Sequence, residues 1–190
     1  MESPFLVLSH ITRVLEEQSI AYVVVGSFAS SLRGLYRTTG DVDIVALIGL
    51  ENVDALISAL KDQFYLDPSA VRRAISEHRS FNAIHFNSVF KVDIFIPAAD
   101  DFGQQQLRRR QAETLSPQMK QTIYVATAED TMLAKLSWYR AGGEISTTQW
   151  RDVLGIIGTQ GQSLDLAYLR EWAHELNVSD LLEKSLGEAL

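Results

Sequence analysis

Two aspartates separated by one residue open an apolar run at positions 41–45, Asp-Val-Asp-Ile-Val. Successive side chains of a β-strand point to opposite faces, so a strand here projects Asp41 and Asp43 from the same face. Upstream, a run of valines at 23–25 ends at Gly26-Ser27, where a tight turn can open a helix. Two carboxylates on one strand face, close to such a turn, can hold a divalent metal beside a phosphate.

A third carboxylate lies in another β-branched and aromatic run, at positions 91–96. Asp93 is flanked there by apolar residues, and a strand beside the first would place it next to Asp41 and Asp43. Mg²⁺ takes hard oxygen ligands, usually carboxylates together with substrate phosphates. The pattern predicts a phosphoryl-transfer site with Mg²⁺ or Mn²⁺, in which the three aspartates are both metal ligands and catalytic residues.

These residues resemble the signature of the nucleotidyltransferase superfamily with the DNA polymerase β-like fold. A narrower resemblance, to the AbiEii-type nucleotidyltransferases of bacterial toxin–antitoxin and phage-defence systems, rests on Arg37-x-Thr39-x-Asp41-x-Asp43, Lys91-x-Asp93, Lys135 and Arg151-Asp152. It covers the chain from about Val23 onward. It implies an NTP substrate, transfer of NMP to a hydroxyl of RNA (tRNA in particular) or of a protein, and an antitoxin partner if the chain is a toxin.

Four further residues are candidates for binding the nucleotide phosphates: Gly26, Ser27, Arg37 and Lys135. Glycine permits the tight turn, and backbone amides at a helix N-terminus favour anions. Gly-Ser alone equally fits an ordinary capped helix, and the downstream aspartates favour the phosphate role. Lys135 is either a cation for the triphosphate or a solvated helix lysine, and the resemblance favours the first. Arg37 is a phosphate contact or a surface residue with equal weight.

Composition narrows the class of protein. The chain has 190 residues, a 46% hydrophobic fraction, no cysteine and a net charge of −7. Disulfides and zinc–thiolate sites are therefore excluded, and a surface that binds nucleic acid throughout is disfavoured, although a local basic groove is not. No signal peptide or apolar run of membrane-spanning length is evident, so we expect a cytoplasmic protein without a membrane partner.

The periodicity predicts both strands and helices, and the nucleotidyltransferase resemblance implies that they form an α+β fold, a mixed β-sheet flanked by helices and followed by a C-terminal helical segment. We expect a catalytic core at 1–126 and a helical segment at 127–190 packed on it. The expected strands are 21–25, 41–45, 81–87, 89–96, 108–116 and 121–126. The expected helices are 5–18, 28–33, 51–64, 70–77, 131–140, 147–157, 165–176 and 179–186, with an exposed polar loop or cap at 98–106.

A competing interpretation keeps the fold and removes the catalysis: a nucleotide-binding or partner-binding module. The three intact aspartates argue against it, because a decayed copy would be expected to lose one. A metal-dependent phosphohydrolase is less well supported, since the histidines lack ligand spacing. Arg151 and Asp152 are either a structural pair that ties the helical segment to the core or contacts to the nucleotide.

Overall fold

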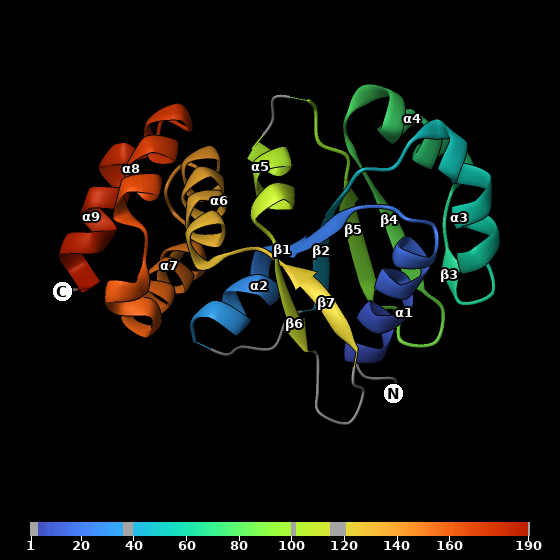
Figure 1. Cartoon of the computed structure of the whole chain (residues 1–190), viewed down its shortest axis with the longest axis horizontal. Helices are drawn as coiled ribbons and strands as arrows, with labels where there is room; N and C mark the ends of the chain where they lie inside the picture. Colours follow the sequence, from blue (N-terminus) through green and yellow to red (C-terminus); the bar gives the residue numbers. More distant parts are fainter. Residues whose placement is uncertain (1–3, 36–39, 100–101, 115–120, 190) are drawn as a thin grey trace. The chain divides into compact units, whose positions relative to one another are not determined.

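The computed structural model describes residues 4–35, 40–99, 102–114 and 121–189. The chain divides into two compact units (Figure 1). The sheet unit comprises Met1–Val25 and Thr39–Val125, and the helical unit comprises Gly26–Thr38 and Ala126–Leu190. The polypeptide therefore leaves the sheet unit directly after its first strand, returns for the second strand, and leaves again after residue 125.

Within the described residues, seven strands form one mixed sheet in the order β3-β4-β5-β2-β1-β7-β6. They are β1 (Tyr22–Val25), β2 (Asp41–Ala46), β3 (Phe64–Tyr65), β4 (Ser80–His85), β5 (Lys91–Phe95), β6 (Gln111–Thr114) and β7 (Thr122–Val125). The β2–β5 and β1–β7 pairs are parallel, and the other neighbours are antiparallel. The predicted α+β class with a mixed sheet is confirmed.

The burial of the strands follows from their sequences. Strand β1 is buried at every position, which suits its valines because branched side chains pack well on a sheet covered on both faces. In β2 and β5, buried apolar residues alternate with half-exposed positions that include Asp41, Asp43 and Asp93. The alternation keeps the carboxylates out of the core while the same strands fill it.

The helices of the sheet unit cover both faces of the sheet. They are α1 (Pro4–Glu17), the 3-10 turn η1 (Leu50–Asn52), α3 (Val53–Leu60), α4 (Pro68–Glu77) and α5 (Phe102–Arg109). On one face, the ring of His10 in α1 packs against Phe64, which packs edge-on against His85 of β4. On the other face, α5 brings Gly103 against Val45, so α5 lies on the side that carries Asp41 and Asp43.

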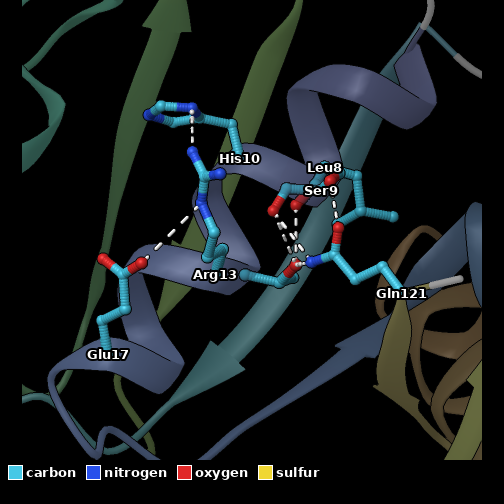
Figure 2. Close-up of polar contacts among 7 residues, drawn as sticks. Leu8, Ser9, His10, Arg13, Glu17 and Gln121 are labelled. Atoms are coloured by element: carbon cyan, nitrogen blue, oxygen red, sulfur yellow. Dashed lines mark hydrogen bonds and ion pairs between the residues drawn. The ribbon is translucent and has the colours of Figure 1, made fainter. Parts of the chain in front are cut away.

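A polar cluster joins α1 to the start of β7 (Figure 2). The Gln121 amide donates to the carbonyl oxygen of Ser9 at 3.0 Å and to Oγ1 of Thr12 at 3.2 Å. The Ser9 hydroxyl in turn donates to Oε1 of Gln121. Both ends of this amide are thus satisfied by one helix face, which holds the beginning of β7 against α1.

The helical unit contains α2 (Gly26–Arg33), α6 (Ala128–Ala141), α7 (Thr147–Gln160), the 3-10 turn η2 (Gly161–Ser163), α8 (Leu166–Glu175) and α9 (Ser179–Ala189) (Figure 1). Helix α2 packs against α6 and α7. Thr127, Ser146 and Asp165 cap α6, α7 and α8 by accepting backbone N–H groups, as their residue types predict. Among the described residues, no helix is long and apolar enough to cross a membrane.

Three sequence-based expectations are corrected. The helix expected at 51–64 ends at Leu60, and Phe64 instead begins β3, where its ring packs against the rings of His10 and His85. The expected loop at 98–106 contains the start of α5, whose buried Gly103 and Gln106 lie among polar residues that hid its periodicity. Helix α2 begins at Gly26, so Ser27 lies in its first turn rather than before it.

Candidate active site

The aspartates of β2 and β5 lie in register on neighbouring parallel strands. Asp43 is the direct register partner of Asp93, and Asp41 is the partner of Lys91. All four residues occupy the half-exposed positions of their strands. Neighbouring strands are about 4.8 Å apart, so the side chains of Asp43 and Asp93 rise from adjacent points of the same face. We call this set of four residues the acidic face.

Both carboxylate oxygens of Asp93 have partners. The ammonium nitrogen of Lys91 lies 2.7 Å from Oδ2. The amide of Asn82, the register partner of Asp93 on β4, donates to Oδ1. The Asp93 side chain is 14% exposed and that of Lys91 is 44% exposed, so the lysine reaches the carboxylate from the solvent side. Asp93 is thereby oriented between an amide and a cation.

The pKa of Lys91 responds to the three carboxylates of the acidic face. Its pKa is raised above the ordinary value, first because its ammonium donates a hydrogen bond to Asp93, and further because of the charges of Asp93, Asp41 and Asp43. Partial burial acts in the opposite direction and is outweighed. The lysine is therefore a cation paired with Asp93 and influenced by the charges of Asp41 and Asp43.

The acidic face fits a divalent cation by its donor set. Three carboxylates on two adjacent strands supply the hard oxygen donors that Mg²⁺ and Mn²⁺ prefer, and Lys91 pairs with one of them, Asp93. In the part of the chain that the structure describes, no three acidic or histidine side chains are gathered as a ready-made metal cage.

The second group of candidate residues lies within the helical unit. Gly26 opens α2 with a φ of +64°, a conformation that glycine adopts without strain. Lys135 of α6 donates to Oγ of Ser27 at 3.4 Å and to Oδ2 of Asp152 on α7 at 2.7 Å. The structure thus brings Ser27 and Lys135 together. Lys135 is 3% exposed, so the alternative of a solvated surface lysine is wrong.

The remaining predicted residues are placed as follows. Asp152 pairs with Lys135, whereas its sequence neighbour Arg151 is exposed, so the two do not act as one Arg/Asp pair. Arg37 and Thr39 lie outside the described residues. His85 is buried and its Nδ1 lies 2.8 Å from the Ser88 hydroxyl.

Sequence reasoning missed Asn82 and the role of Lys91. The signal for Asn82 was present: a hairpin centred on Asn87-Ser88, counted outward, sets Asn82 opposite Asp93, as the structure has it. For Lys91, alternation alone puts its side chain on the face of Asp93. What the sequence could not show is the register of β5 against β2, because parallel strands are joined by no short turn that fixes it.

The chain resembles known proteins in its fold. No protein-family model matches the chain, and no curated protein matches it in sequence. Among solved structures, an antigenic nucleotidyltransferase-like protein from Paracoccidioides brasiliensis matches at TM-score 0.56 and 17% identity, covering 96% of this chain and 91% of that chain. The chain thus has the fold of nucleotidyltransferase-like proteins.

Two antibiotic-modifying proteins share this fold. The antibiotic-resistance factor ANT(2'')-Ia matches at TM-score 0.58 and 12% identity over 95% of both chains. The lincosamide antibiotic adenylyltransferase LnuA, solved with lincomycin, matches at TM-score 0.51 and 13% identity, covering 82% of this chain and 96% of that chain. The likeness spans nearly the full length of these structures, so it includes the helical unit as well as the sheet.

Proposed function

We propose that this chain is a metal-dependent nucleotidyltransferase that moves NMP from an NTP to a hydroxyl acceptor. The observation that carries the proposal is the register pair Asp43–Asp93, with Asp41 on the same strand face, inside a fold shared with nucleotidyltransferase-like proteins. Carboxylates that converge from two strands are more than the fold requires, because packing alone would favour apolar side chains or scattered polar ones at these positions.

Each aspartate has a proposed task. Asp41, Asp43 and Asp93 would hold Mg²⁺ or Mn²⁺, which when bound neutralises charge on the triphosphate and polarises its phosphorus. Asp93, oriented by Asn82, would also take the proton from the acceptor hydroxyl. The acceptor oxygen then bonds to the α-phosphorus, the bond from that phosphorus to the bridging oxygen breaks, and pyrophosphate leaves. No covalent enzyme intermediate is needed.

The helical unit would bind the rest of the triphosphate. We assign this task to the Gly26-Ser27 turn and to Lys135, whose ammonium contacts the Ser27 hydroxyl, with Arg37 as a further cation. Lys135 would stabilise charge that develops on the leaving pyrophosphate.

The acceptor follows from resemblance rather than from contacts. The likeness of the Arg37-to-Asp43, Lys91-x-Asp93 and Lys135 motifs to AbiEii-type toxins favours RNA, tRNA in particular, with a protein side chain as the second choice. It also favours a toxin role with an antitoxin partner. The solved neighbours include LnuA bound to lincomycin and ANT(2'')-Ia in complex with adenylyl-2''-tobramycin, so a small-molecule hydroxyl is a third acceptor to include in the test.

The test is label transfer. The protein is incubated with each α-³²P-labelled NTP, Mg²⁺ or Mn²⁺, and in separate reactions total bacterial RNA, a cell protein extract, or lincomycin and tobramycin. Label should move to one acceptor class and should disappear with Asp43→Asn or Asp93→Asn. The matched control is Asp54→Asn, which alters an exposed aspartate of α3 whose partner is Arg72. Transfer that persists in the Asp43 and Asp93 variants would refute the assignment.

One observation favours the alternative, a non-catalytic nucleotide-binding or partner-binding module. Lys91 and Asn82 take both oxygens of Asp93, which would be a stable end state for a site that never binds metal. The two functions differ in a direct measurement: a module would bind nucleotide equally well with and without Mn²⁺. A transferase should bind it more tightly with the metal, and that gain should vanish in Asp41→Ala/Asp43→Ala.

A further inference from the structure

The acidic face carries its own cation. Lys91 is the register partner of Asp41 and forms an ion pair with Asp93, the register partner of Asp43. Asp43 and Asp93 are register partners, so their carboxylates repel one another, and the positive charge of Lys91 beside Asp93 reduces that repulsion. A lysine at this position therefore stabilises the protein when no metal is bound, and it uses one of the oxygens that a metal would need.

We infer that Lys91 is a resident counter-cation that competes with the divalent metal for Asp93 and so sets the metal affinity of the site. This inference rests on the proposed function. When the metal arrives, the Lys91 ammonium leaves Oδ2, whereas Asn82 keeps Oδ1 and holds the carboxylate in orientation. Lys91 is then a residue that tunes metal binding rather than a ligand of the metal.

The exposure of the lysine makes this exchange feasible. The Lys91 side chain is 44% exposed and ends a flexible four-carbon stem, so it can swing into solvent without opening the core. Ion pairs with an exposed partner are weak, which limits the competition to roughly 1.5–5-fold in metal affinity. Asn82 differs because it lies on β4 directly opposite Asp93, so its amide keeps the hydrogen bond to that carboxylate.

The experiment is Mn²⁺ titration by calorimetry and by electron paramagnetic resonance, with no nucleotide present. Lys91→Met should bind Mn²⁺ about 1.5–5-fold more tightly than wild type, because the competing cation is gone. Lys91→Arg, which keeps a cation, should stay near wild type. The metal-free Lys91→Met protein should melt at a lower temperature than wild type, and Mn²⁺ should remove the difference. Lys61→Met, an exposed lysine beyond α3, is the control.

Each outcome decides the inference. Unchanged or weaker Mn²⁺ binding in Lys91→Met overturns the inference. The same holds if Lys91→Met lowers only the affinity for nucleotide, because the lysine then binds the triphosphate instead. If wild type binds no Mn²⁺ but Lys91→Met does, the inference holds in its strongest form. If neither binds, both the inference and the proposed metal site fail. If Asp43→Asn abolishes wild-type binding while Lys91→Met leaves it unchanged, only the inference fails.

Discussion

The ammonium of Lys135 lies 2.7 Å from Oδ2 of Asp152, and the two side chains are only 4% and 8% exposed. They join α6 to α7, and the same ammonium reaches the hydroxyl of Ser27 in the first turn of α2. A buried charge pair is held by mutual attraction against the loss of hydration of both ions. Removing one partner therefore has a larger effect than removing both.

Lys135→Met should lower the free energy of unfolding by about 3–5 kcal/mol, because the Asp152 carboxylate loses the cation opposite it inside the fold. Lys135→Met/Asp152→Leu should recover most of that loss. Urea denaturation followed by circular dichroism measures both. Arg170→Met, which breaks the exposed Arg170–Glu183 pair, should change stability little and serves as the control. Equal losses of stability in the single and double variants would show that the unpaired Asp152 carboxylate does not cause the destabilisation.

Gly34, directly after α2, allows the backbone to approach α7 closely. A Cβ added there would lie 2.8 Å from the backbone nitrogen of Ile156, a contact that neither backbone can relieve without moving. Gly34→Ala should therefore destabilise the protein by roughly 1–3 kcal/mol through overpacking. Gly158→Ala, in the same α7 helix but with open space around it, should stabilise it by up to about 1 kcal/mol. Thermal unfolding of the two variants tests the contrast.

The strands that carry the acidic face were predictable because alternation in 41–45 and 91–96 is strong, and the buried positions confirm it. The α5 helix was not predictable, since Gln106 is buried by tertiary packing that no local period reveals. Likewise the sequence left Lys135 as either a phosphate-binding cation or a solvated lysine, and its buried pairing with Asp152 of α7 could not be predicted from it. Local pattern thus predicts elements, whereas charge pairing between distant segments needs the assembled fold.

His10 couples α1 to the sheet and should make stability depend on pH. Its pKa is lowered because the ring is partly buried and because the charges of Arg13 and His85 oppose protonation, with Glu17 acting in the other direction (Figure 2). Its Nδ1 also lies 3.3 Å from Nη2 of Arg13, where it must accept rather than donate. The folded protein therefore favours the neutral ring, whereas the unfolded chain takes up a proton near pH 6.5.

Because the folded pKa is the lower one, the unfolded state binds more protons below about pH 6.5, and stability falls as the pH drops through that value. His10→Gln should flatten the fall between pH 7.5 and 5.5, measured as urea midpoints at each pH. His174→Gln, at an exposed site on α8, should leave the slope unchanged. A slope that persists in His10→Gln would assign the acid sensitivity to another group.

Val89 adopts a φ of +56° in the turn between β4 and β5, and 73% of the residue is exposed. The left-handed region is unfavourable for a residue with a branched Cβ, by roughly 1–2 kcal/mol, and glycine avoids that strain while losing more chain entropy on folding. Val89→Gly should therefore raise the free energy of unfolding by up to about 1 kcal/mol. Ile145→Gly, at an equally exposed β-branched residue without a positive φ, should not stabilise the protein. Parallel denaturation curves decide the matter, and a loss of stability in both variants would show that the turn is not strained.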